Sequence, residues 1–239
     1  MRFISKSKIV LWLILPVMIQ SLPAQTIKEN PYHLRILSDI NTYTRIISRD
    51  SLKKLVDLQQ YVPGIQLDIR YATSNNFTHK KIYTSAKAYA RLPVARALAG
   101  VQKELNSKGL GLKLYDAYRP YAATLLFYET IKDTIFVAAP WKGSRHNRGC
   151  AVDVSLIDQK TGKELDMPTP FDDFTKKASP VYSDLPSDVL KNRQILTDAM
   201  SRWGFSVYPS EWWHFDYKGW DKYELIDLSF EELEQIEKK

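Results

Sequence analysis

The chain has 239 residues, of which 44% are hydrophobic, enough for one sizeable core but too few for two substantial domains. Its formal net charge of +7 arises from interspersed acidic and basic residues without a block of Lys or Arg, so the charge does not indicate a nucleic-acid-binding protein. Cys150 is the only cysteine, which excludes an intramolecular disulfide and the cysteine-based zinc and redox motifs.

Residues 1 to 24 have the pattern of a secretory signal peptide. Arg2, Lys6 and Lys8 precede an apolar stretch, residues 9 to 19, that is shorter than the roughly 20 residues of a transmembrane helix. Cleavage after Ala24 would remove three positive charges and no negative ones, lowering the net charge from +7 to +4. We therefore expect an exported protein, periplasmic or extracellular, without stable membrane insertion after cleavage. A retained N-terminal anchor is the alternative.

The remaining chain divides into a polar extension, residues 25 to 50, and one domain, residues 51 to 239. The extension shows no firm periodicity, which suggests a segment lying on the domain or a tether. Helices mixed with short, hairpin-like strands then indicate an α+β fold, a single domain with a central antiparallel sheet flanked by helices. In chain order, the patterns predict a strand at 65–69, a helix from Pro93 that ends before Gly109, a strand at 110–118 and a helix at 120–131. An alternating segment at 150–157 and a helix at 187–203 follow. The apolar stretch 205–208 comes after Gly204, and a last strand is predicted at 211–220.

Three polar side chains in this domain form a candidate metal site. His146, Asp153 and His214 offer two imidazoles and one carboxylate, a set that suits a catalytic zinc with an open fourth position. Asp153 lies on a strand that is otherwise apolar, where an unpaired charge is costly. Taken alone, His146 is more simply a hydrogen-bonded turn residue, so the prediction depends on the combination. The other two histidines, His33 and His79, are in polar segments and are expected at the surface.

Two further residues would complete a hydrolytic site. Glu211 lies three residues before His214, and an odd separation puts two residues of a regular strand on opposite faces. We therefore expect Glu211 on an irregular lead-in after Pro209, from which it could accept a proton from water. Arg119 follows a strand and could stabilise an oxyanion. The alternatives are an aromatic core strand around Glu211 and a surface ion pair for Arg119.

The motifs that carry these residues resemble those of the zinc D-alanyl-D-alanine dipeptidases, which include the vancomycin-resistance dipeptidases and belong to a wider group with the D,D-carboxypeptidases. The resemblance extends from about Leu52 to Asp227. It is carried, in order, by LDIRYAT, NNFT, DAYRP, GSRHNRGCAVDVSL, MPTPFDDF and EWWHFDYKGW. Cys150 is at a position where the family commonly has alanine.

The resemblance implies one Zn²⁺ per chain held by His146, Asp153 and His214, with Glu211 as general base and Arg119 stabilising the transition state. It also implies substrate contacts, with Ser144 binding the terminal carboxylate and Tyr71 and Asp172 near the free ammonium group. The alternatives are that the neighbouring Asp173 has this role, or that both aspartates only stabilise a loop. The implied reaction is hydrolysis of D-Ala-D-Ala to two D-alanines.

An exported enzyme would meet dipeptides released from the mature cell wall, so the predicted location favours wall turnover or nutrient recovery over antibiotic resistance. Two other functions are considered. One is a D,D- or L,D-carboxypeptidase that trims longer muropeptides, and the other is a non-catalytic module that binds cell-wall peptide. Glu211 argues against the module, because binding alone needs no base beside the third ligand.

Overall fold

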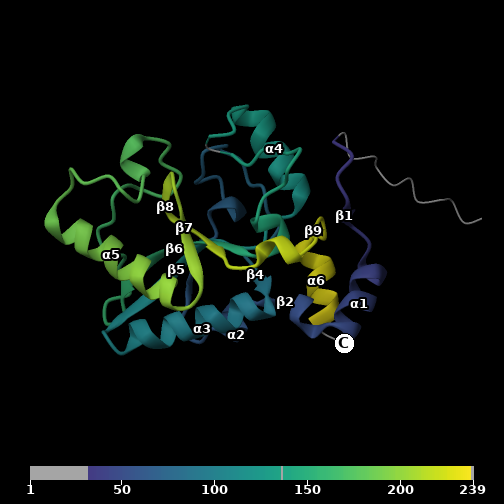
Figure 1. The fold of residues 1–239 in the computed structure, drawn as a ribbon, viewed down its shortest axis with the longest axis horizontal. Coiled ribbons are helices and arrows are strands. Elements are labelled where there is room, and N and C mark those ends of the chain that lie inside the picture. Colours follow the sequence, from purple (N-terminus) through teal and green to yellow (C-terminus); the bar gives the residue numbers. More distant parts are fainter. Residues whose placement is uncertain (1–31, 136, 238–239) are drawn as a thin grey trace, which may run out of the picture. The chain divides into compact units, whose positions relative to one another are not determined.

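The computed structural model describes residues 32–135 and 137–237, which lie in one compact unit. The predicted signal peptide and the first residues of the extension lie outside the described residues. The helices and strands are β1 (Ile36–Leu37), α1 (Ile40–Arg49), β2 (Leu55–Asp57), α2 (Leu58–Tyr61), β3 (Gln66–Leu67), β4 (Tyr89–Arg91), α3 (Leu92–Asn106), β5 (Leu110–Asp116), α4 (Tyr121–Ile131), β6 (Ala151–Asp158), α5 (Ser187–Arg202), β7 (Phe205–Tyr208), β8 (Glu211–Tyr217), β9 (Leu225–Ile226) and α6 (Phe230–Glu237) (Figure 1).

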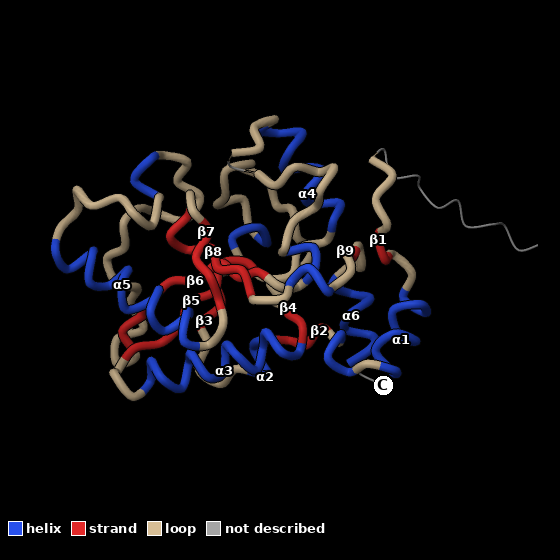
Figure 2. Tube along the Cα trace, in the orientation of Figure 1, coloured by secondary structure: helices blue, strands red, loops and turns tan. Residues whose placement is uncertain are grey.

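A five-stranded sheet in the order β3-β5-β6-β8-β7 forms the centre of the fold, with the helices arranged around it (Figure 2). The pairs β5–β6, β6–β8 and β7–β8 are antiparallel, whereas the edge strand β3 runs parallel to β5. The predicted α+β fold with a largely antiparallel sheet is thus confirmed. Two small sheets, β1–β9 and β2–β4, lie outside the central one.

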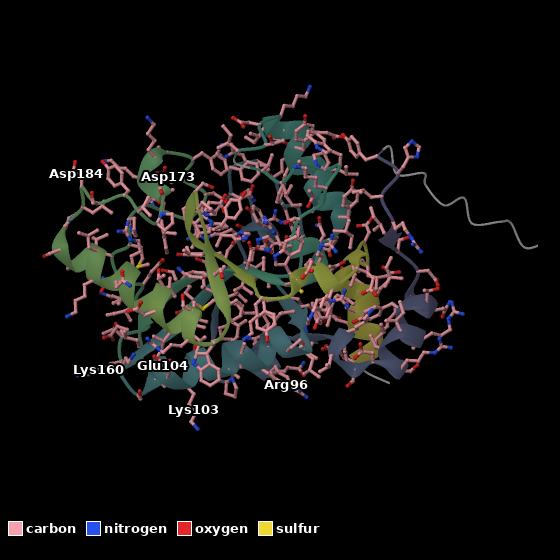
Figure 3. All side chains as sticks on the ribbon, in the orientation of Figure 1. Arg96, Lys103, Glu104, Lys160, Asp173 and Asp184 are labelled. Carbon is pink, nitrogen blue, oxygen red and sulfur yellow. The ribbon has the colours of Figure 1, made fainter. Side chains whose placement is uncertain are left out.

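The helices α3 and α5 contact each other and pack on the central sheet. Their apolar residues recur at helical spacing, as Leu98, Val101 and Leu105 do on α3, and all three are completely buried. Arg96 and Lys103 extend from the outer side of α3 (Figure 3). No helix within the described ranges is long and apolar enough to cross a bilayer.

The predicted strand at 65–69 is shorter than expected. Only Gln66 and Leu67 pair with β5, because the chain turns into a 3₁₀ helix at Arg70. Ile65 and Ile69 are nevertheless buried, so the alternating pattern identified core residues while overestimating the length of the strand.

Much of the predicted N-terminal extension is ordered. The described part contains β1, which pairs with β9, and α1, whose Tyr43 is buried. The backbone N–H of Leu55 donates a hydrogen bond of 2.6 Å to the hydroxyl of Tyr43. The described part of residues 25 to 50 therefore lies on the domain, and the domain boundary at residue 51 stays a prediction.

Candidate active site

The three predicted ligands meet on the central sheet. Asp153 on β6 and His214 on β8 are directly paired across the two strands, which brings their side chains to the same face. His146 begins a short 3₁₀ helix just before β6, where Gly149 at φ 67° turns the chain into the strand. All three residues are buried.

The potential ligand atoms form a nearly regular triangle. His146 Nε2 lies 3.2 Å from His214 Nδ1 and 3.4 Å from Asp153 Oδ1, and the latter is 3.2 Å from His214 Nδ1. Tetrahedral zinc with ligand bonds of about 2.0–2.1 Å separates its ligand atoms by about 3.3 Å. Within residues 32–135 and 137–237, these residues form the one His, Cys, Asp or Glu group with spacing suited to a metal.

Hydrogen bonds at the far side of each imidazole select the nitrogen that faces the triangle. His146 Nδ1 lies 2.7 Å from the carbonyl oxygen of Ala117, and His214 Nε2 lies 3.0 Å from Asp216 Oδ1. Each of these nitrogens therefore carries the proton, which leaves the other nitrogen as a lone-pair donor.

The charge of Asp153 is the strongest argument for a bound cation. Its Oδ1 atom is buried and makes no hydrogen bond with the described residues. A buried carboxylate with an unbonded oxygen is costly unless a cation compensates it, so the residues present fit a zinc ion.

Glu211 lies beside this group because β8 is irregular. The neighbouring β7 residues Val207 and Tyr208 pair with Phe215 and Glu211, so three β8 residues bulge between these partners. Glu211 thereby reaches the face of His214, with 3.6 Å between Oε2 and Nδ1. The expected irregularity exists, but it lies inside the strand and not before it.

The environment of Glu211 suits a proton acceptor. Burial, reinforced by the charge of Asp153 and opposed by His214, raises the pKa of Glu211 to about 7. A carboxyl group with this pKa exchanges protons readily near neutral pH.

Arg119 is buried beside the three potential metal ligands and is not a surface arginine. Its Nε and Nη2 donate to Asp116 Oδ2 at 3.0 and 2.8 Å, and Nη2 lies 4.0 Å from Asp153 Oδ2. The guanidinium also lies over the ring of Phe127, 4.7 Å from its centroid. Asp116 pairs across the sheet with Asp153, so the positive charge of Arg119 offsets the repulsion between two facing carboxylates.

The side chains predicted to bind substrate lie in the same cleft. Ser144 is buried, and its Oγ accepts a hydrogen bond of 3.1 Å from the N–H of His146. The hydroxyl of Tyr71 donates to Asp172 Oδ1 and Oδ2 at 3.0 and 3.1 Å. Burial, together with the charge of Asp153, raises the pKa of Asp172.

Asp173, the alternative to Asp172, does not line the cleft. Its Oδ1 accepts a hydrogen bond of 2.8 Å from the backbone N–H of Thr175, and Figure 3 labels it on the outer loop. The geometry therefore favours Asp172 for contact with a ligand.

The cleft has a volume of about 440 Å³. It is lined by all eight predicted site residues, and its aromatic walls were not foreseen from the sequence. Its lining includes Tyr71, Ser144, His146, Asp153, Asp172, Glu211, His214, Arg119, Phe77, Phe127, Arg145, Tyr208, Trp213 and Trp220.

Sequence reasoning missed the residues that orient the predicted ones. Asp116 holds Arg119, Asp216 holds His214, and Asn147 donates to the carbonyl oxygen of Arg119 at 2.9 Å. One signal was available for Asp216, because residues two apart on a strand share a face.

Two histidines and the cysteine lie outside the candidate site. His33 and His79 are exposed, as predicted. Cys150 is completely buried, and burial raises the pKa of its thiol to about 12. This thiol is therefore protonated at neutral pH and poorly reactive.

Two imidazoles and a carboxylate that could hold a metal, with a further carboxyl group and a buried arginine beside them, are the groups found in metal-dependent hydrolases. A family model described as D-Ala-D-Ala dipeptidase matches residues 51–225. The chain belongs to this family, a family of zinc metallopeptidases. The family and the enzyme class predicted from the motifs are confirmed.

Curated relatives agree with this assignment. The chain is 34% identical over 177 residues to the D-alanyl-D-alanine dipeptidase of Escherichia coli (strain K12), an overlap of 74% of this chain and 91% of the relative. The D-alanyl-D-alanine dipeptidase of Enterococcus faecium is 28% identical over 178 residues, which cover 66% of this chain and 88% of the relative.

Solved structures show weaker likeness. The LD-carboxypeptidase LdcB has a TM-score of 0.39 and 21% identity, with coverage of 62% of this chain and 69% of that one. VanYB in complex with D-alanine-D-alanine has a TM-score of 0.39 and 16% identity, with coverage of 59% and 77%. The family assignment rests on the sequence matches.

Proposed function

We propose that this protein is a zinc-dependent dipeptidase that hydrolyses D-Ala-D-Ala to two D-alanines, with one zinc per chain. The observation that carries the proposal is the triangle of His146 Nε2, Asp153 Oδ1 and His214 Nδ1 beside Glu211. Membership of the dipeptidase family supports the substrate. Zinc held by these three residues would supply a Lewis acid and would make water nucleophilic at neutral pH.

Glu211 is the proposed general base. Its carboxylate accepts a proton from the attacking water and then delivers that proton to the leaving amine. The raised pKa suits both halves of this exchange, because a carboxyl group with a pKa of about 7 is readily protonated and deprotonated near neutral pH.

Arg119 is the proposed stabiliser of the oxyanion that develops on the attacked carbonyl group. Asp116 occupies Nε and Nη2 of the guanidinium, so Nη1 is not engaged by that carboxylate. Because the charge is buried and held in advance, its interaction with a developing negative charge is stronger than in water.

The two termini of the dipeptide are assigned to different polar side chains of the cleft. Asp172, held by Tyr71, receives the ammonium group, whose positive charge would keep Asp172 ionised despite burial. The hydroxyl of Ser144 is assigned to the C-terminal carboxylate. The cleft of about 440 Å³ lies within the roughly 300–1,000 Å³ range of ligand pockets and can hold a short peptide.

The physiological proposal is turnover or recovery of wall-derived dipeptides by an exported enzyme. It is supported by the sequence pattern of residues 1 to 24.

One assay tests the activity. The purified protein, loaded with zinc, is incubated with D-Ala-D-Ala, with L-Ala-L-Ala and with a muropeptide that ends in D-Ala-D-Ala, each with and without a chelator. We expect chelator-sensitive release of D-alanine from the D,D-dipeptide. Release from the muropeptide alone would favour a carboxypeptidase, and binding without hydrolysis would favour a non-catalytic module.

A further inference from the structure

Arg145 stands out among the residues that line the cleft. It lies between Ser144 and His146, and its side chain retains 35% of its exposure. Its backbone is held by hydrogen bonds of 3.1 Å from the N–H groups of Arg148 and Cys150 to its carbonyl oxygen. These hydrogen bonds fix the backbone from which the side chain extends.

Aromatic rings hold the guanidinium without using its hydrogen-bonding capacity. The guanidinium carbon lies 4.8 Å from the ring centroid of Trp220 and 5.6 Å from that of Tyr208. The ring of Tyr208 in turn lies 5.0 Å from the ring of His214. Stacking on aromatic rings fixes the plane of the guanidinium and leaves its N–H groups available in that plane.

A single ion pair partly compensates the positive charge of Arg145. Arg145 Nε forms an ion pair of 3.5 Å with Asp216 Oδ2 but makes no hydrogen bond, although this nitrogen is buried. Asp216 is already engaged through its other oxygen with His214. Among the residues that the structure describes, none accepts a hydrogen bond from the guanidinium of Arg145.

We propose that Arg145 is a specificity-determining residue that binds the C-terminal carboxylate of the substrate. This inference rests on the proposed dipeptidase function. The neutral hydroxyl of Ser144 supplies one hydrogen bond to a carboxylate, whereas a guanidinium supplies a full charge and two parallel donors. Arg145 and Asp172 then give the cleft one charge for each terminus of a zwitterionic dipeptide.

The test compares D-Ala-D-Ala with D-alanyl-D-alaninamide, which lacks the terminal negative charge. The variants are Arg145→Gln, Arg145→Lys and, as a matched control, Lys142→Gln, which removes a positive charge from an exposed residue of the same cleft. Initial rates give kcat and KM for both peptides, and zinc content is measured on every preparation.

For the unmutated protein we expect a strong preference for the free acid. Arg145→Gln should raise KM for D-Ala-D-Ala by about tenfold or more, the size expected when a charge-assisted hydrogen bond is lost, with kcat nearly unchanged. KM for the amide should hardly change, so the preference should largely disappear. Arg145→Lys should retain part of it, Lys142→Gln should retain all of it, and zinc content should stay normal throughout.

Two results would overturn the proposal. One is an unchanged preference for the acid in Arg145→Gln. The other is an equal loss of activity with both peptides together with lost zinc, which would mean that Arg145 acts through Asp216 on His214.

If the unmutated, zinc-loaded protein hydrolyses neither peptide, the dipeptidase proposal fails. Calorimetric binding of the two peptides then decides the role of Arg145 separately, by whether Arg145→Gln abolishes preferential binding of the acid.

Discussion

Glu211 occupies a position where burial and neighbouring charges act on its proton affinity in opposite directions. Burial and Asp153 favour the neutral acid, while His214 and Arg119 favour the carboxylate. The result is a carboxyl group suited to both accepting and releasing a proton, which an exposed glutamate with its ordinary pKa would do less well.

The substitution Glu211→Gln tests this role. The amide has nearly the same shape as the carboxylate but cannot accept the proton, so the turnover of D-Ala-D-Ala should fall by about a hundredfold or more. Zinc content and dipeptide affinity should remain close to those of the unmutated protein. Near-normal turnover measured on the same preparation would remove Glu211 from the role of general base.

The two imidazoles are predicted to hold the metal. In His146→Ala or His214→Ala, a corner of the triangle of ligand atoms is missing, so elemental analysis should show most of the zinc lost. His79→Ala is the matched control, because His79 is exposed and outside the group. Full zinc occupancy in both site variants would exclude these residues as ligands.

At the scale of elements, two local irregularities build the site. The bulge in β8 brings Glu211 to the face of His214, and the left-handed turn at Gly149 connects His146 to β6. Regular strands would separate these groups, because successive side chains of a strand point to opposite faces.

Gly149→Ala tests the turn. Gly149 has φ 67°, and an added Cβ would lie 2.4 Å from Leu55 Cδ2, so the substitution combines backbone strain with a clash. We expect a loss of about 2–4 kcal/mol in the free energy of unfolding, measured by chemical denaturation, together with weaker zinc binding.

Gly162→Ala provides the control for Gly149→Ala. Gly162 has the same φ of 67° but no atom within 4 Å of an added Cβ. The free energy of unfolding of Gly162→Ala should fall by only about 1 kcal/mol, the contribution of backbone strain, and this variant should keep its zinc. Equal losses in the two variants would show that contact with Leu55 is unimportant.

At the scale of the whole molecule, segments outside the candidate site contribute to the packing around it. Arg91 at the end of β4 is completely buried, and its Nε donates to the carbonyl oxygen of Arg148 at 2.7 Å. Its Nη1 donates to the carbonyl oxygen of Lys53, so one side chain joins the start of the domain to the loop that carries His146.

The export prediction belongs to this scale as well. If residues 1 to 24 are a cleaved signal peptide, protein purified from its native host should begin near Gln25 and should fractionate outside the cytoplasm. N-terminal sequencing of the fractionated protein measures both properties. An intact N-terminus on cytoplasmic protein would contradict the prediction and would favour an intracellular role.

The sequence by itself determined those features that depend on local pattern and residue chemistry. Helical spacing predicted α3 and α5, alternation predicted β5 and β6, and the chemistry of two imidazoles and a carboxylate predicted a metal group. The predictions of helices and strands succeed because a buried face requires apolar residues at a fixed period, whatever the rest of the chain does.

Only the tertiary structure decided which side chains share a face and what orients them. The bulge in β8, the short edge strand β3, and the pairs Asp116–Arg119 and Asp216–His214 depend on strand register and on contacts between distant segments. Local pattern does not specify register when strands such as β6 are buried on both faces, because both sets of alternating side chains are then compatible with the core. The position of Arg145 is likewise decided only by the fold, which brings Trp220 and Tyr208 against its guanidinium.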